Sequence, residues 1–399
     1  MGGSHFYQGG TRMDLRKEIA ELTPNLIALR RDFHAHPEVG AQEFRTAQKI
    51  EDELKSLGME VRRCLPTGVI GVLKGGKPGK TLCMRSDIDA LPVQEETGLP
   101  FASENPGVMH ACGHDNHMAC LLTTARLMAN HREEISGTIV FLFQTNEEDA
   151  GAQDMIDAGA LDDPRPDAIM GMHVWSYTKE GWIGIVPGAL MASSWYFKLT
   201  IHGKGGHGGS PHSCINPIDC AMHVLQAFQT FHTLEMDAKK PTTVTVGKLQ
   251  AGEFNIVVPD DCLMEGSIRC LHNDDAQVRE RIRELIDGVC KTYRCTYDLE
   301  YKCGNSLLDN DPEMTKMVID VADEVMGPGH IDDGCATMIG EDFAEFLKVV
   351  PGVFFFMGIA DHEKGTDYEH HNCRFNAPET VLPKAVEMQC TLIRKYLGF

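Results

Sequence analysis

The feature that most limits the possible folds is a change in strand character along the chain. Outside residues 193–303, short expected strands such as 137–143 are apolar throughout and lie between helical patterns. Continuous apolar strands separated by helices are typical of a sheet that helices cover on both faces. Between 193 and 303 the strands alternate instead, as in 196–201, which predicts a sheet with one open face. A chain of 399 residues also exceeds the size of a single core, so we expect two domains.

The order of expected elements indicates that one domain is inserted into the other. Outside the insert we expect helices at 15–29 (interrupted by Pro24), 43–57, 118–129 and 312–325, and strands at 68–73, 81–85, 137–143, 168–172 and 353–357. Inside it we expect strands at 195–202, 242–249, 261–271 and 296–303, and helices at 217–231 and 274–293. That β-α-β-β-α-β order is ferredoxin-like. The predicted fold class is therefore α/β, with a helix-flanked sheet domain (14–188 and 304–399) and an inserted ferredoxin-like domain (189–303).

Charge and cysteine content exclude several classes of protein. The chain has 58 acidic and 37 basic residues, a net charge of -21, so we expect neither nucleic acid nor an anionic membrane as partner. It has no apolar stretch of about 20 residues that could span a bilayer. Fourteen scattered cysteines suit a reducing cytoplasm better than a disulfide framework. Residues 1–13 lack the apolar run of a secretory signal, and we interpret them as a disordered or artificial leader.

Residues 110–117 (HACGHDNH) indicate a metal site. They place His, Cys and Asp within eight positions, a grouping that is uncommon unless a divalent ion is held there. In an extended segment, Cys112 and His114 project to the same side and could bind one ion together. A buried thiol beside polar helix-capping residues is the alternative interpretation.

Three further groups carry ligand-type side chains. Glu147 and Glu148 follow the end of one expected strand, and His173 follows the next. Functional groups of an open α/β sheet gather at such strand ends. His370 and His371 form a pair in a C-terminal loop. Five ligands suit two ions, and the remaining carboxylate suits a general base. An acidic surface turn and structural histidines are the alternatives.

Taken together, these residues resemble the M20 metallopeptidases, in particular the amidohydrolase branch of hippurate hydrolases, N-acyl-amino-acid deacylases and auxin-conjugate hydrolases. The motifs are 84–92 (MRSDIDALP), 109–115 (MHACGHD), 144–148 (QTNEE), 205–207 (GGH) and 371–372 (HN). Asp87, where more distant M20 peptidases have a His, favours the amidohydrolase branch. The chain departs from the family at 145–146, where Thr-Asn replaces the usual Pro-Ala, and after His207, where Gly-Gly-Ser replaces a small Ala pair.

The resemblance implies a role for each of these residues. Cys112 would bridge two divalent ions (Mn, Zn, Co or Ni), with His114 and Glu148 completing one site and His173 and His371 the other. Glu147 would be the general acid/base, and Asp89 would support the ligands from behind. The inserted domain would be a lid that forms a homodimer and sends His207 into the partner's active site. Asn255 and Arg269 would hold the carboxylate or carbonyl of the substrate; the alternative for Arg269 is a surface arginine.

The function that we expect is hydrolysis of the amide bond of an N-acyl amino acid, such as a hippurate-, N-acetyl- or arylacetyl-type compound. Two ions would lower the pKa of a shared water. Alternatives are a metallo-dipeptidase of the same fold, a non-catalytic protein that binds metal and small conjugates, and a thiol hydrolase with Cys112 as nucleophile.

Overall fold

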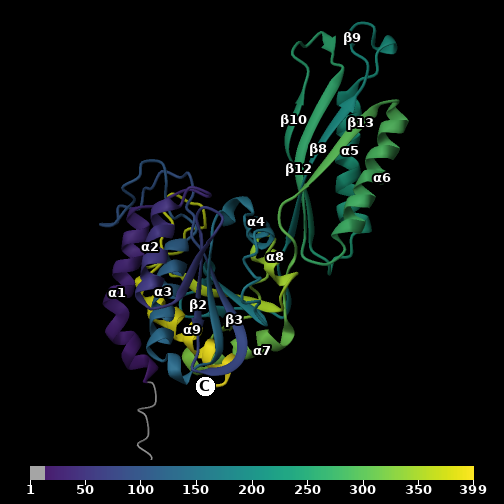
Figure 1. The fold of residues 1–399 in the computed structure, drawn as a ribbon. Coiled ribbons are helices and arrows are strands. Elements are labelled where there is room, and N and C mark those ends of the chain that lie inside the picture. Colours follow the sequence, from purple (N-terminus) through teal and green to yellow (C-terminus); the bar gives the residue numbers. More distant parts are fainter. Residues whose placement is uncertain (1–13) are drawn as a thin grey trace, which may run out of the picture. The chain divides into compact units, whose positions relative to one another are not determined.

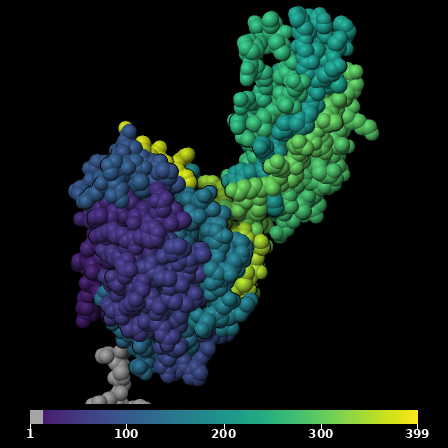
Figure 2. Space-filling view, turned by 45° about the horizontal axis from the view of Figure 1, so that its top comes forward, coloured from purple at the N-terminus to yellow at the C-terminus, as the bar shows by residue number. Residues whose placement is uncertain are grey.

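In the computed structural model, residues 14–399 are described and divide into two compact units (Figure 1). The first unit holds residues 14–185, 312–334 and 350–399, and the second holds 186–311 and 335–349. The predicted boundaries instead place 186–188, 304–311 and 335–349 in the first domain. The leader expected at 1–13 lies outside the described residues. In Figure 2 the visible surface of the first unit is mostly purple to blue, the N-terminal part of the chain, and that of the second is teal to green.

An eight-stranded mixed sheet forms the centre of the first unit. Its order is β1 (Glu60–Cys64), β2 (Gly68–Lys74), β4 (Ser136–Gln144), β3 (Lys77–Asp87), β5 (Ala168–Lys179), β16 (Gly352–Ala360), β6 (Ile183–Gly184) and β15 (Ile331–Asp332). The four central strands, β4, β3, β5 and β16, are parallel to one another, whereas the outer neighbours β2 and β6 pair with them antiparallel. Most of their residues are buried, which confirms the α/β class predicted from the continuous apolar strands.

Helices cover this sheet. They include α1 (Leu15–Ala35), α2 (Phe44–Ser56), α3 (His114–Asn130), α4 (Ala152–Asp157), α7 (Pro312–Val325) and α9 (Leu382–Leu397). α3 and α9 contact strand β3, and α1 packs on α3 and α9. The expected break at Pro24 is wrong, because α1 continues through it. Among residues 14–399, no helix combines the length and apolar character needed to cross a membrane.

Strand register brings the polar ends of the central strands to one edge of the sheet. Asp87, the last residue of β3, pairs with Gln144, the last residue of β4. On β5, His173 pairs with Phe356 of β16. We expected His173 just after a strand, but β5 runs on to Lys179, because pairing with β16 continues beyond His173. His173 therefore projects from within a paired strand.

The second unit contains a four-stranded antiparallel sheet. Along the chain its elements are β8 (Ser193–His202), α5 (Pro217–Thr230), β10 (Thr242–Ala251), β12 (Asp261–Cys270), α6 (Asp275–Tyr293) and β13 (Thr296–Cys303), and the strand order is β10-β12-β8-β13. Phe197, Leu199 and Ile201 of β8 are buried in a core with residues of α5 and α6. Tyr196, which directly precedes Phe197 and so points to the opposite face, is exposed. Short elements complete the unit: β7 (Gly188–Met191), β9 (Gly206–His207), β11 (Val257–Val258), β14 (Leu308–Asn310) and α8 (Phe343–Leu347).

Candidate metal centre

Cys112 lies at the centre of the candidate site. It is buried in the loop before α3, at the sheet edge described above. Its Sγ is 3.5 Å from Nε2 of His173. The same sulfur forms a second group with Glu148 and His371, whose ligand atoms all lie within 4.8 Å of one another. A thiolate with one group on each side can belong to two ion sites at once.

The prediction that Cys112 and His114 project together from an extended segment is wrong. Gly113 between them has a φ of 91°, and His114 is the first residue of α3. The chain therefore turns sharply between the two residues. His114 reaches the site from the first turn of the helix, and Cys112 from the loop.

His173 presents a free lone pair to Cys112. Its Nδ1 donates to the carbonyl oxygen of Val174 at 2.6 Å, so Nε2 carries no proton in the neutral ring. Burial, followed by neighbouring histidines, lowers the pKa of His173 well below its usual range. A thiolate and an imidazole that bind one ion at about 2.3 and 2.1 Å with a tetrahedral angle are separated by about 3.5 Å. The spacing of Cys112 and His173 fits that geometry.

Two buried atoms near Cys112 indicate where a cation fits. Nε2 of His114 and Oε1 of Glu148 are 4.0 Å apart, and neither has a hydrogen-bond partner among the described residues. Buried polar atoms normally have partners. A divalent ion about 2.1 Å from each atom would supply one. The other oxygen of Glu148, Oε2, is 3.3 Å from Nε2 of His371, a spacing that also suits two ligands of one ion.

The structure keeps one of the two pairings that the resemblance implies. His114 and Glu148 occur in one group, together with Glu147. His173 and His371 occur in separate groups, and Cys112 belongs to both of these.

Asp89 connects two of the candidate ligands. Nδ1 of His114 is 2.9 Å from the backbone oxygen of Asp89 and 3.2 Å from its Oδ1. Oδ2 of Asp89 accepts the backbone N–H of Glu148 at 3.0 Å. These bonds direct Nε2 of His114 away from Asp89, toward the ion position.

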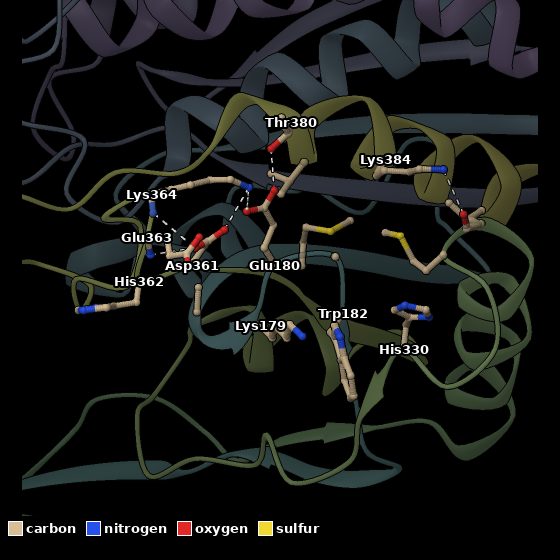
Figure 3. Close-up of a pocket in the computed structure, with 16 residues that line it drawn as sticks. Lys179, Glu180, Trp182, His330, Asp361, His362, Glu363, Lys364, Thr380 and Lys384 are labelled. Carbon is tan, nitrogen blue, oxygen red and sulfur yellow. Dashed lines mark hydrogen bonds and ion pairs between the residues drawn. The ribbon is translucent and has the colours of Figure 1, made fainter.

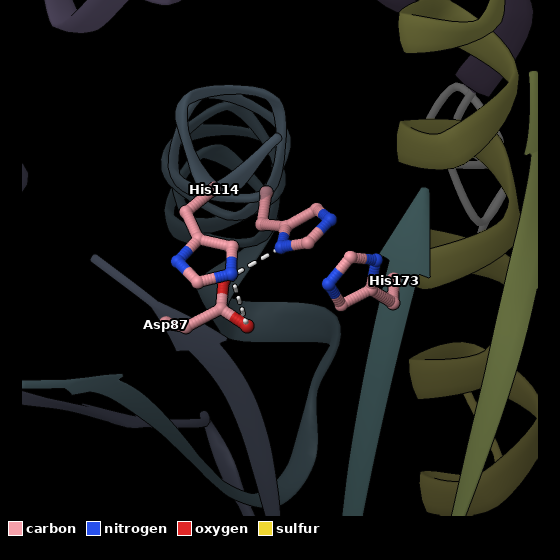
Figure 4. A group of neighbouring side chains, drawn as sticks. Asp87, His114 and His173 are labelled. Carbon is pink, nitrogen blue, oxygen red and sulfur yellow. Dashed lines mark hydrogen bonds and ion pairs between the residues drawn. The ribbon is translucent and has the colours of Figure 1, made fainter. Parts of the chain in front are cut away.

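The charge around His114 favours a cation. Burial lowers the pKa of His114, but Asp87, Asp89 and Glu148 together outweigh burial and raise it to about 10. Figure 4 shows His114 on its helix next to Asp87, with His173 facing them from β5. Nε2 of His114 is 3.7 Å from Oδ2 of Asp87 and 4.0 Å from Oε2 of Glu147. Without an ion, a proton on His114 supplies the positive charge that these carboxylates favour.

Two histidines that the sequence analysis left without a role have their ring nitrogens engaged. Nδ1 of His117 donates to Oδ1 of Asp87 at 2.6 Å, and its Nε2 accepts the N–H of Val174 at 2.9 Å. Nε2 of His370 accepts the N–H of Ser176 at 3.2 Å, which leaves the proton on Nδ1, 3.8 Å from Sγ of Cys112. Both therefore act as supports and not as ligands. The i, i+3 spacing of His114 and His117 signals a shared helix face, but no sequence signal gives the role of His370.

Glu147 lies at the mouth of this group. It begins a short 3-10 turn (Glu147–Asp149) that follows Asn146, a non-glycine residue with a φ of 58°. Its side chain is 10% exposed, and its Oε2 is 4.0 Å from Nε2 of His114. A carboxylate at that position can exchange protons with a water at the ion site.

The remaining predicted residues belong to the second unit. His207 is exposed on β9, and its Nδ1 accepts the N–H of Gly209 at 2.9 Å. Asn255 is exposed in the segment between β10 and β11. Arg269 is half-buried on β12 and donates to the carbonyl oxygen of Met338 at 3.0 Å. The candidate ion ligands all come from the first unit.

A cavity of about 840 Å³ in the first unit is lined by other residues (Figure 3). Lys179, Trp182 and His330 lie on its wall, and its basic groups include Lys364 and Lys384. Lys364 pairs with Glu180 and Asp361, and Lys384 pairs with Glu387. Because the lining residues include none of the candidate ligands, this cavity is separate from the metal centre.

Known proteins resemble this chain over most of its length. The model of peptidase family M20/M25/M40 matches residues 83–395. Thermostable carboxypeptidase 1 of Saccharolobus solfataricus is 35% identical over 375 residues, which cover 92% of this chain and 94% of that protein. N-acetyl-L-cysteine deacetylase of Bacillus subtilis is 35% identical over 393 residues, covering 96% and 92%.

A solved structure is similar over nearly the full length. It is a Bacillus subtilis protein described as a dinuclear metal binding peptidase from the M20 family. It has a TM-score of 0.83 and 33% identity, and the match covers 95% of this chain and 99% of that one.

Proposed function

This chain belongs to peptidase family M20/M25/M40 and is a hydrolase, and we propose that it cleaves the amide bond of N-acyl amino acids at a site that holds two divalent ions. The pair of buried, partnerless atoms beside Cys112, Nε2 of His114 and Oε1 of Glu148, carries the proposal. Cys112, His114 and Glu148 would hold one ion. Cys112, His173 and His371 would hold the other. Thiolate, imidazole and carboxylate ligands allow Zn, Mn, Co or Ni.

The remaining side chains have proposed roles in the proton transfers. The bound ions would lower the pKa of water toward neutrality and polarise the substrate carbonyl. Glu147 would take the proton of the attacking water on a carboxylate oxygen and return it to the nitrogen of the leaving amine. Asp89 would keep Nε2 of His114 directed at its ion, through the bonds from Nδ1.

Residues 189–303 of the second unit would complete the site as a ferredoxin-like lid and dimerisation domain. Its β10-β12-β8-β13 order supports that fold. His207 of the partner subunit would donate to the carbonyl oxygen as negative charge develops there. Arg269 and Asn255 would bind the substrate carboxylate, Arg269 through the guanidinium N–H groups that do not face Met338.

A substrate panel on metal-analysed protein tests the function. We expect two ions per chain and turnover of N-acetyl and N-benzoyl amino acids that is lost in chelator. Glu147→Gln should retain both ions and lose turnover by about 1000-fold, because only the proton carrier is removed. A thiol hydrolase would keep its activity in chelator, and a non-catalytic binding protein would turn over none of the panel.

The second candidate is a peptidase that releases a C-terminal amino acid, which the carboxypeptidase name of one relative favours. Both substrate classes place a free carboxylate one residue after the scissile amide. They differ in the group that acylates the scissile nitrogen, which is a simple acyl group in one class and an aminoacyl or peptidyl group in the other, and a dipeptidase also requires a free α-amine. Assays of N-acetyl amino acids and matched dipeptides, side by side, separate the two.

A further inference from the structure

We infer that Glu43 is a positioning residue for this reaction, because it holds the turn that carries Glu147 and Glu148. The inference rests on the proposed function only in the role it gives to Glu147. Glu43 directly precedes α2, about 100 residues away in the chain, and its relative exposure is 0%. A fully buried carboxylate needs strong hydrogen-bond donors.

Glu43 finds these donors in the turn. Its Oε1 accepts the backbone N–H of Asn146 at 2.9 Å. Oγ1 of Thr145 is 2.9 Å from each of its oxygens, and Oγ1 of Thr67 donates to Oε2 at 2.7 Å. Oγ1 of Thr67 and Oγ1 of Thr145 are themselves 2.7 Å apart. Glu43 thus binds the two residues that immediately precede Glu147.

The turn has a left-handed residue on each side, which makes its backbone dependent on support. Asn146 has a φ of 58°, which asparagine tolerates, but Ala150 has a φ of 63°, which costs such a residue about 1 kcal/mol. Gly40 lies three residues before Glu43 in the chain and packs against Asn146. A Cβ at Gly40 would overlap Oδ1 of Asn146. The segment 40–43 therefore fits the turn both by shape and by hydrogen bonds.

Glu43 and Asp89 hold the turn at two successive points. Asp89 binds the backbone N–H of Glu148, and Glu43 binds that of Asn146. Glu147 lies between these points. Without Glu43, the N–H of Asn146 would lose its acceptor, a loss that favours rearrangement of the turn. A shift of about 1 Å in a catalytic group can reduce the rate about 100-fold.

The test compares Glu43→Ala with a matched control, Glu38→Ala. Glu38 lies in the same loop and its side chain also accepts backbone hydrogen bonds. Its donors are the N–H groups of Arg45 at 3.1 Å and Thr46 at 2.8 Å, and both belong to α2. We expect Glu43→Ala to lower kcat by about 30-fold or more with KM within about threefold, because substrate contacts are unchanged. Glu38→Ala should change kcat by less than about twofold.

Glu43→Gln provides the rescue. Burial raises the pKa of Glu43, so a neutral side chain of the same shape should be tolerated there. Its amide oxygen can still accept the N–H of Asn146. We expect kcat of Glu43→Gln to lie within about fivefold of the kcat of the wild-type enzyme.

Cobalt titration, followed by visible absorption, gives a readout that does not depend on turnover. In Glu43→Ala the ion that Glu148 holds should bind about tenfold more weakly, while Glu38→Ala should match the unchanged protein. If Glu43→Ala does not fold, Thr145→Val, which removes only one hydroxyl, should shift kcat and cobalt affinity in the same direction. Equal behaviour of the Glu43 and Glu38 variants in both measurements would overturn the inference. Absence of amide turnover in the unchanged protein would overturn the proposed function alone, since the cobalt result would still decide the role of Glu43.

Discussion

His117 and His114 lie one helical turn apart on α3, but their ring nitrogens have different surroundings. Both nitrogens of His117 have hydrogen-bond partners, Asp87 and the N–H of Val174. Nε2 of His114 has none among the described residues. A lone pair that already accepts an N–H cannot bind an ion as well. His114 is therefore the ligand of the pair, and His117 links the helix to β5.

This difference predicts opposite outcomes for two alanine variants. His114→Ala should lose one of two bound ions, because it removes a ligand. His117→Ala should retain both but lose about 1–3 kcal/mol of stability, because the N–H of Val174 becomes a buried donor without an acceptor. Metal analysis after dialysis and urea unfolding measure the two effects. Loss of an ion in His117→Ala with His114→Ala unaffected would reverse the assignment.

Metal affinity should depend on pH through His114. Without an ion its pKa is about 10, above the ordinary 6.5, so at pH 7 the ring is protonated and an incoming ion must displace that proton. Because the proton competes, affinity should rise with pH, by about tenfold per pH unit between pH 6 and 8 from this group. The same raised pKa stabilises the metal-free protein. This stabilisation is fully present below about pH 6.5 and is lost as the pH rises through about 10.

Two measurements check this dependence. Competition with a chelator of known affinity gives the dissociation constant at pH 6, 7 and 8. Calorimetry in buffers of different ionisation enthalpy counts the protons released. A constant affinity over this range, without proton release, would contradict the pKa of His114.

At this scale the sequence identified the donors but not their orientation. Cys112 stood out because it lies in a segment dense in His, Cys and Asp, and Glu148 and His173 because they follow expected strands; the structure brings the three together. His370 could not be assigned, because its role depends on which nitrogen meets the N–H of Ser176. Glu43 could not be found either, since its partners lie about 100 residues further along the chain.

The start of α3 depends on Gly113. Its φ of 91° is accessible to glycine but strained for other residues, and a Cβ there would lie 2.5 Å from Cγ2 of Val174. We expect Gly113→Ala to lose about 2–4 kcal/mol of stability and to weaken metal binding, because Cys112 and His114 flank the turn. Urea unfolding and metal titration measure these changes.

Gly98→Ala is the matched control. Gly98 has a φ of 70°, but a Cβ there would meet nothing within 4 Å. It should lose only the backbone contribution, about 1 kcal/mol, and should bind metal normally. The double variant Gly113→Ala, Val174→Ala should recover part of the loss by removing the clash. Equal effects of the two glycine variants would show that the Val174 contact is unimportant.

Element types followed from local patterns, whereas their limits depended on packing. Pro24 predicted an interrupted helix, yet α1 continues because Leu26, Leu29 and Phe33 are buried on the inner helices. That burial offsets the hydrogen bond that Pro24 cannot make, which costs about 3 kcal/mol. In the same way β5 extends past His173 because β16 pairs with it. Tertiary contacts of this kind are absent from any local window of sequence.

For the whole molecule, the alternation of polar and apolar residues predicted where strand character changes. It did not predict every segment that belongs to each of the two units. Residues 335–349 belong to the second unit although they lie between two segments of the first. They include a bridge from Thr337 to Met191, a long-range pairing that no local pattern indicates. All fourteen cysteines lie among the described residues, where each is a free thiol.

The proposed shared active site predicts subunit complementation. Each site would combine Glu147 of one subunit with His207 of the other, so neither Glu147→Gln nor His207→Ala should be active alone. In a heterodimer of the two, one site carries both changes and the other carries neither. After subunit exchange of an equal mixture, half of the dimers should be mixed, and about a quarter of full activity should return.

The control mixes Glu147→Gln with a chain that carries both Glu147→Gln and His207→Ala. This mixture should stay inactive, since no dimer in it has an intact site. If the first mixture also stays inactive while sedimentation shows that exchange took place, each site is built from a single chain, and His207 must act on its own subunit or not at all.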